Sequence, residues 1–231
     1  VAWIKNNLFD RQRMRPVLRR LRAGSNVLDI GAGAGKLLML LRRISKHPIK
    51  LHGNDLAFDE ATRQALVSQD ITLLPGAIEF CDTPVKFDAI TGIHVIEHVL
   101  DPLAVFRWIY DHLNRGGVLY FETPDAATVL RRIFGNNWGH THFPRHLNLF
   151  SKKHLAQLAT DAGLVVESHR NTTSAPAWNM SIRNSLKMDA LTKHRSIFEM
   201  FNYTNKLTLG FFTLVDLVLI GAGIPTSTQQ L

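Results

Sequence analysis

The sequence is poor in cysteine and in acidic residues. Its 231 residues include one cysteine, Cys81, which leaves no partner for an internal disulfide. No uninterrupted apolar run of the signal-peptide kind occurs near the N-terminus. Asp and Glu number 19 against 27 Lys and Arg, so the formal net charge is +8. The shortage of cysteine excludes a disulfide-rich scaffold and suits a reducing compartment. We therefore expect a cytoplasmic protein and leave association with a membrane open.

The excess of basic residues is concentrated near the N-terminus, without the aromatic residues that would stack on bases. Arginines alternate there with apolar residues at helical spacing: Arg11, Arg13, Arg15, Arg19, Arg20 and Arg22 with Met14, Val17, Leu18 and Leu21. This pattern predicts a basic amphipathic helix within residues 1–23. A solvated face or a contact with an anionic membrane explains it at least as well as RNA, so we do not expect a nucleic-acid partner.

The pattern of apolar residues predicts alternating strands and helices. With 45% hydrophobic and 20% charged residues, the chain can bury one sizeable core. Strands are predicted at 26–30, 49–53, 71–74, 87–92, 117–122 and 164–168, and helices at 35–45, 59–68, 101–113 and 151–162. This order is typical of an α/β protein with a doubly wound, Rossmann-like, mostly parallel sheet and helices on both faces. Ligands of such sheets bind beyond the carboxyl ends of the strands.

The most informative motif is a glycine-rich turn after the first predicted strand. Residues 27–35 read Val-Leu-Asp-Ile-Gly-Ala-Gly-Ala-Gly, and glycine lets a backbone pass close to a ligand. The dinucleotide template does not fit, because Lys36 stands in the place of its third glycine, and the P-loop template is absent. The D-x-G-x-G-x-G pattern resembles motif I of the class I S-adenosylmethionine (SAM) dependent methyltransferases. This resemblance implies that SAM is the cofactor.

Two later segments extend the resemblance. Asp55 follows the second predicted strand, where an acidic side chain can accept both ribose hydroxyls of an adenosine; a helix cap is the alternative role. Residues 75–79 resemble the family's segment near the adenine, although Ala77 replaces the usual acid. The cofactor site that the resemblance implies consists of Asp29, Gly31, Ala32, Gly33, Gly35, Asp55, Leu56, Ala77, Ile78, Ile93 and His94.

The stretch from Phe87 to Pro102 carries a second motif. Its Phe-Asp start and its Glu97-His98-Val-Leu-Asp-Pro end resemble the signature of the methyltransferase group that includes the quinone-biosynthesis O-methyltransferases and many sugar- or lipid-directed relatives. The same stretch contains His94-x-x-Glu97-His98, which also matches a zinc-protease pattern. We expect no metal, because the match falls at a strand end within the methyltransferase order.

Methyl transfer to a hydroxyl would be helped by a base with a pKa near neutrality, which favours histidine. We expect O-methylation of a small-molecule or lipid-like acceptor. His94, at the end of the fourth predicted strand, is the first candidate for the base, with His142 and His146 as rivals. The two rivals belong to the segment 137–151, which resembles the family's substrate-facing segment after the fifth strand.

The C-terminal part resembles the family least. We expect residues 24–170 to form the SAM-binding domain and residues 171–231 a helical insertion or lid. Within the insertion, the pattern of residues 207–224 predicts an amphipathic helix. Its polar side contains Asn202, Asn205, Thr213 and Asp216. We expect this helix to pack on the domain or to lie on a membrane surface. No convincing final strand follows, so we expect a truncation there.

Two other functions remain open at this point. One is an NAD(P)-dependent oxidoreductase on a similar sheet, which the glycine spacing disfavours. The other is a catalytically silent basic module that binds membranes or RNA. The glycine loop followed by Asp55 argues against it, because a silent module needs no cofactor site.

Overall fold

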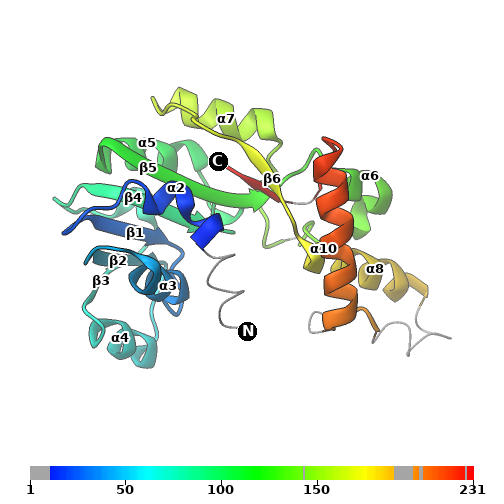
Figure 1. Ribbon diagram of the computed structural model, residues 1–231, viewed down its shortest axis with the longest axis horizontal. Coiled ribbons are helices and arrows are strands. Elements are labelled where there is room, and N and C mark those ends of the chain that lie inside the picture. Colours follow the sequence, from blue (N-terminus) through cyan, green and yellow to red (C-terminus); the bar gives the residue numbers. More distant parts are fainter. Residues whose placement is uncertain (1–10, 143, 190–199, 203–204, 227) are drawn as a thin grey trace. The chain divides into compact units, whose positions relative to one another are not determined.

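The computed structural model describes residues 11–142, 144–189, 200–202, 205–226 and 228–231 (Figure 1). Its strands form a seven-stranded sheet in the order β3-β2-β1-β4-β5-β7-β6. The pairs β1–β2, β1–β4 and β2–β3 are parallel, whereas β7 runs antiparallel to both β5 and β6. The strands are β1 (Asn26–Ile30), β2 (Lys50–Asp55), β3 (Ile71–Pro75), β4 (Phe87–Ile93), β5 (Leu113–Pro124), β6 (Arg170–Thr172) and β7 (Thr228–Gln230). The predicted Rossmann-like, mostly parallel sheet is confirmed.

Helices connect most of the strands. The α-helices are α2 (Arg15–Leu18), α3 (Lys36–Ile44), α4 (Glu60–Val67), α5 (Pro102–His112), α6 (Val129–Phe134), α7 (Lys152–Asp161), α8 (Ala175–Asp189) and α10 (Lys206–Gly221). Short 3-10 turns are η1 (Ile78–Phe80), η2 (Ile96–His98) and η3 (Gly135–Asn137). Asp101 caps α5 by accepting from the amide of Ala104, with Pro102 in the first turn, as the sequence predicts.

The chain divides into two compact units. The first holds the described residues up to 95 together with 101–121 and 158–165, and the second holds 96–100, 122–157 and the described residues from 166 onward. In the first unit, α2 and α3 pack with one face of the strands through a cluster that includes Val27, Leu38 and Leu51. On α5, Phe106 lies edge-on to Phe121 of β5, with ring centroids 5.6 Å apart. The cluster holds β1, whose carboxyl end leads into the glycine loop, in the core of the first unit.

Three strand predictions need correction. The predicted strand at 164–168 is wrong, because the structure has no regular element there and places β6 at 170–172. Strand β5 (Leu113–Pro124) begins directly after α5, four residues before the predicted strand at 117–122, and ends two residues after it. The expectation of no strand near residue 231 is also wrong, since β7 forms there and joins β5 to β6. Its polar residues pair through the backbone, which a hydrophobic pattern does not reveal.

Within the described residues, the N-terminal basic segment is helical at 11–13 and again in α2. Residues 1–10 of the predicted helix lie outside those residues. The apolar positions Met14, Val17 and Leu21 are buried in the core of the first unit, and Arg15 and Arg19 are exposed. The apolar side of this segment therefore packs on its own unit.

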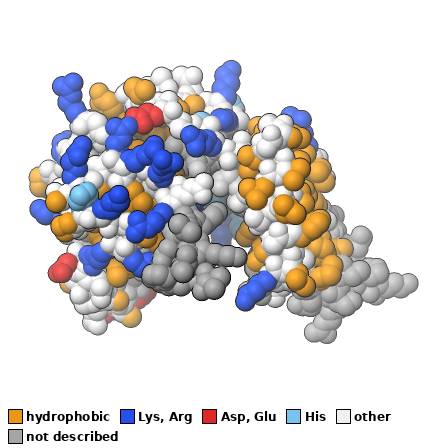
Figure 2. Space-filling model, in the orientation of Figure 1, with side chains coloured by type: hydrophobic (Ala, Val, Ile, Leu, Met, Phe, Trp, Pro, Cys, Tyr) orange, Lys and Arg blue, Asp and Glu red, His pale blue; other side chains and the backbone are white. Residues whose placement is uncertain are grey.

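Helix α10 buries Asp216 and Phe212 and exposes a stripe of apolar side chains. Asp216 is fully buried and accepts hydrogen bonds from the Ser174 amide at 2.6 Å and the Trp178 indole N–H at 2.8 Å. The opposite face carries exposed Leu207, Phe211, Leu214, Leu217 and Val218, which appear in Figure 2 as a hydrophobic band along the helix. Among the described residues, no helix has both the length and the apolar character needed to cross a bilayer. The side of α10 that packs on the unit therefore carries both Asp216 and Phe212, whose ring stacks on Trp178 with centroids 5.0 Å apart.

Candidate functional site

The glycine loop connects β1 to α3 in a conformation that glycine alone adopts readily. Gly31, Gly33 and Gly35 have φ values of +71°, +49° and +70°. A Cβ atom at Gly31 would lie 2.3 Å from the Val95 side chain, and one at Gly35 would lie 2.3 Å from Leu66. Gly35 also precedes the first turn of α3 as its N-cap. The outer two glycines are therefore required by the packing of the first unit itself.

The middle glycine differs, because the space beside it is open. No described atom lies within 4 Å of a Cβ built at Gly33. Its amide donates a 2.8 Å hydrogen bond to Asp55 Oδ2, and Asp55 Oδ1 accepts from the Leu56 amide at 2.8 Å. Asp55 is half-buried and so remains accessible to a ligand. The predicted acidic residue is thereby held against the predicted loop.

Asp29 lies beneath this loop. Its side chain is 4% exposed and accepts a hydrogen bond of 2.8 Å from the Thr91 hydroxyl on β4. Burial raises the pKa of Asp29 to about 7, the Thr91 hydrogen bond opposes the rise, and the charge of Asp55 adds to it. Asp29 therefore belongs to the buried residues that support the glycine loop. Its protonation state depends on pH near neutrality.

The other predicted cofactor residues occupy the ends of the neighbouring strands. Leu56 follows β2 and is 76% exposed. Ala77 precedes η1, and Ile78 within that turn is buried. Ile93 ends β4 and is half-buried. An exposed apolar side chain next to Asp55 is suited to covering the flat face of a heterocycle.

His94 has a left-handed backbone with φ of +55° and an exposed side chain. Such a conformation is uncommon for a residue other than glycine and is often held at functional sites. The zinc-protease pattern would place His94 and His98 one turn apart on an α-helix. Instead β4 ends at Ile93 and a 3-10 turn covers Ile96–His98, so that arrangement is not formed.

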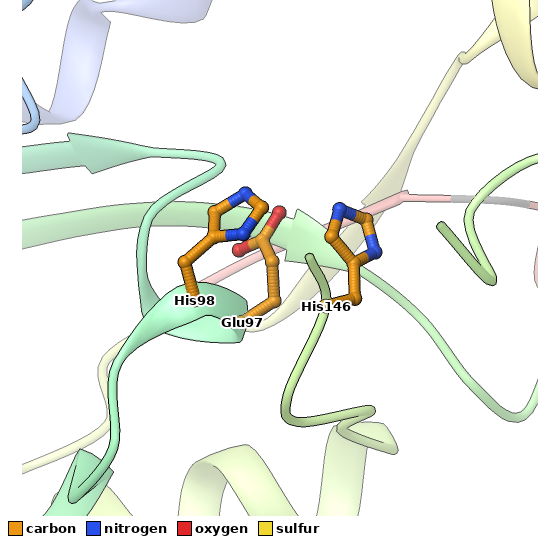
Figure 3. Close-up of side chains that lie close together, drawn as sticks. All are labelled: Glu97, His98 and His146. Carbon is orange, nitrogen blue, oxygen red and sulfur yellow. The ribbon is translucent and has the colours of Figure 1, made fainter. Parts of the chain in front are cut away.

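The second unit brings together Glu97, His98 and His146 (Figure 3). One ligand atom from each side chain, a carboxylate oxygen or a ring nitrogen, lies within 4.8 Å of the other two. The His98 and His146 rings meet edge to face with centroids 4.8 Å apart. Glu97 is 1% exposed, whereas His98 is exposed and His146 is half-buried. Such a group can hold a proton, a polar ligand or a metal ion.

Backbone and side-chain hydrogen bonds hold the two segments of this cluster together. The Glu97 carbonyl accepts from the amides of Leu147 and Asn148 at 2.8 and 3.0 Å, and the Asn148 side chain donates to the Val99 carbonyl at 2.7 Å. The Thr123 hydroxyl donates to Glu97 Oε2 at 2.8 Å. These hydrogen bonds therefore fix the positions of Glu97, His98 and His146 within the second unit.

His142 stacks on His146, with ring centroids 5.1 Å apart and planes inclined by 27°, and has a φ of +31°. Burial lowers the pKa of His146, while its hydrogen bond to the His140 carbonyl and the charge of Glu97 raise it. Of the predicted catalytic histidines, the structure thus joins His142 to His146. His94 belongs to the first unit.

Sequence reasoning missed the meeting of Glu97 and His98 with His146, and it missed Thr123. Both segments were singled out as motifs, but nothing in a single sequence indicates that they touch. The only available signal was their shared place after the ends of β4 and β5, which lie side by side in the sheet.

Comparisons with known protein families and with individual relatives agree on one family for this chain. Residues 7–169 match the model of a methyltransferase domain family. A ubiquinone biosynthesis O-methyltransferase of Pseudomonas putida is 29% identical over 163 residues, which cover 67% of this chain and 70% of the relative.

Solved structures share the fold at lower identity. Phosphoethanolamine N-methyltransferase 2 of Haemonchus contortus, in complex with SAM, aligns with a TM-score of 0.59 and 17% identity over 95% of this chain and 51% of that chain. The cyclopropane synthase MmaA2 of Mycobacterium tuberculosis aligns with a TM-score of 0.55 and 16% identity, covering 95% and 81%.

Proposed function

Because this chain belongs to the methyltransferase domain family and is a SAM-dependent methyltransferase, we propose that it methylates an oxygen atom of a small-molecule acceptor. The observation that carries this choice is the abundance of histidine next to the segments that resemble the O-methyltransferases. A hydroxyl needs to lose its proton as it attacks the methyl group, and imidazole is the side chain suited to accept it near neutral pH. The O-methyltransferase relatives support the same choice.

The cofactor site of this proposal is the glycine loop of the first unit. Gly33 leaves room for SAM beside the backbone, and Asp55 accepts the ribose hydroxyls with the lone pairs that its two backbone hydrogen bonds leave available. Leu56 and Ile78 border the adenine. Ala77 offers its backbone in place of the missing carboxylate. Asp29 supports the loop from below through Thr91.

The proposed general base is His94. Its left-handed backbone at the end of β4 is held by the structure of the first unit, the unit that contains the glycine loop. His142 and His146 remain the rivals. His146 has one ring nitrogen committed to the His140 carbonyl at 2.6 Å, which leaves its other nitrogen as the acceptor.

Paired acceptors test the choice of oxygen. The full chain is incubated with SAM and a hydroxyl acceptor, either a catechol or a phenol. A parallel reaction contains the corresponding aromatic amine. Products are identified by the mass gain of one methyl group. We expect transfer to hydroxyl compounds and none to the amines. Methylated amines without methylated hydroxyl compounds would overturn the oxygen assignment while leaving SAM dependence intact.

We further propose that the acceptor is lipid-like and is taken from a membrane surface by way of α10. Leu207, Phe211, Leu214 and Val218 recur at spacings of four, three and four residues, which places them in one stripe of the helix. Their side chains are at least 62% exposed. With Lys206 at the start of the helix and a net charge of +8, this face suits the anionic cytoplasmic leaflet.

Flotation with vesicles tests this contact. We expect the full chain to float with vesicles that contain anionic lipid and the Phe211→Ser, Leu214→Ser double variant to remain in the soluble fraction. The control is Val165→Ser, which changes a still more exposed apolar residue of the first unit. Equal flotation of the wild-type chain and the double variant would contradict the proposal.

A further inference from the structure

We propose that Glu97, His98 and His146 form a binding site for one divalent transition-metal ion in the second unit (Figure 3). Two imidazoles and one carboxylate are a ligand set found in mononuclear zinc and iron sites. This inference goes beyond methyl transfer and does not depend on it, since all three ligands and their supports lie within one compact unit.

Hydrogen bonds determine the orientation and the tautomer of both imidazole rings in a way that suits metal binding. His98 Nδ1 lies 2.8 Å from the Arg145 carbonyl oxygen, and His146 Nδ1 lies 2.6 Å from the His140 carbonyl oxygen. A carbonyl oxygen can only accept, so each Nδ1 must carry the proton. Each neutral ring then has its lone pair on Nε2. A backbone carbonyl behind the ring is the usual orienting partner of a metal-bound histidine.

The carboxylate is oriented in the same way. The Thr123 hydroxyl donates to Glu97 Oε2, and both side chains are at most 1% exposed. The amides of Leu147 and Asn148 bind the Glu97 carbonyl and so fix the segment that carries His146. A buried negative charge facing two imidazole rings provides a favourable position for a cation.

The ligand chemistry selects the class of ion. Imidazole nitrogen suits Zn²⁺, Co²⁺ and Fe²⁺, whereas Mg²⁺ and Ca²⁺ prefer all-oxygen sites. Ligands about 2.1 Å from zinc in a tetrahedron are roughly 3.4 Å apart, so ligand atoms within 4.8 Å of one another must approach by up to about 1.4 Å. Exposed His98 is able to make this adjustment. Three protein ligands leave a position for water or for an oxygen atom of a hydroxyl- or carboxylate-bearing ligand.

The test uses the full chain after treatment with a chelator. Co²⁺ and Zn²⁺ are titrated by calorimetry, and Co²⁺ is also followed by its visible absorption, which reports nitrogen and oxygen ligation in the wild-type chain. We expect one ion per chain. Glu97→Gln, which retains an acceptor for Thr123, and His98→Ala and His146→Ala should each weaken binding at least about tenfold.

His154→Ala is the matched control, because His154 is an exposed histidine of the same unit outside the cluster. We expect its metal affinity to equal that of the wild-type chain. The site would be overturned if the wild-type chain bound no stoichiometric ion, if its Co²⁺ spectrum lacked nitrogen ligation, or if the cluster variants bound as tightly as His154→Ala. Affinity for S-adenosylhomocysteine, measured on every variant, shows that each is folded. If the wild-type chain did not bind S-adenosylhomocysteine, the proposed SAM site would be contradicted, but the metal site would not.

Discussion

The glycine loop and the histidine cluster are built in opposite ways. The loop's residues follow one another in the chain, and its shape comes from backbone conformation at Gly31, Gly33 and Gly35. The cluster joins side chains from distant segments, since His98 and its hydrogen-bond partner Arg145 are separated by 47 positions in the sequence. A contiguous motif can be found in a sequence, whereas an assembled cluster becomes visible only in the folded unit. The predictions below test whether function follows the same division.

The largest effect on turnover is expected at His94. Replacing it by asparagine retains a residue that tolerates a left-handed backbone but removes the base. We expect the kcat to fall about 100-fold or more, the usual contribution of general base catalysis, with a much smaller loss of affinity for S-adenosylhomocysteine, because His94 also belongs to the predicted cofactor site. Parallel steady-state assays of His142→Asn and His146→Asn make the comparison complete. A wild-type kcat in His94→Asn would assign the base to the second unit.

A pH-dependent stability is expected from Asp29. Its pKa of about 7 in the folded protein lies above the unfolded value near 3.8, so the folded state retains a proton that the unfolded state loses. The associated stability is present below pH 4 and is lost as the pH rises through 7. Since one pKa unit is about 1.4 kcal/mol, the free energy of unfolding of Asp29→Asn should rise relative to wild type by up to about 4 kcal/mol between pH 4 and pH 8. Urea unfolding at both pH values measures it, and a constant difference would show that Asp29 does not titrate.

A smaller effect is expected at Gly33. Alanine there adds a Cβ that meets no described atom but enters the space assigned to the cofactor, at a φ of +49°. We expect affinity for S-adenosylhomocysteine to fall at least about tenfold, which is 1.4 kcal/mol, with about 1 kcal/mol lost from stability. Gly24→Ala is the control, since it shares the positive φ and open surroundings outside the loop. If Gly33→Ala and Gly24→Ala bound S-adenosylhomocysteine with equal affinity, Gly33 would not lie beside the cofactor.

The smallest effect concerns the second unit, where Asp216 joins α10 to Ser174 and Trp178. Asparagine can accept through one side-chain atom only, so one of the two hydrogen bonds is lost. We expect Asp216→Asn to lower the free energy of unfolding by about 1 kcal/mol, partly offset because burial raises the pKa of Asp216. Thermal unfolding checks this value. An unchanged melting temperature would show that the inward polar side of α10 contributes nothing.

Much of the fold could be predicted from the sequence, because the parallel strands are apolar runs bounded by recognisable turns. β1 matched its prediction, and β2, β3 and β4 differed only at their ends. β6 and β7 could not be found, since these three-residue polar strands are stabilised by pairing with neighbours.

The same limit applied to α10 and to the candidate site. The helical wheel separated the polar from the apolar side but could not show that the Trp178 indole and the Ser174 amide would satisfy Asp216 inside the unit. The local glycine loop was predicted with its supporting Asp55. The long-range meeting of Glu97 and His146 depends on contacts that no local pattern encodes.

Calorimetric titration of the wild-type chain with S-adenosylhomocysteine and, separately, with NAD tests the account most directly. Because Lys36 breaks the dinucleotide template and Gly33 and Asp55 form the loop described above, S-adenosylhomocysteine should bind with one molecule per chain and NAD should give no binding heat. Binding of NAD without binding of S-adenosylhomocysteine would contradict the assignment of this loop to SAM.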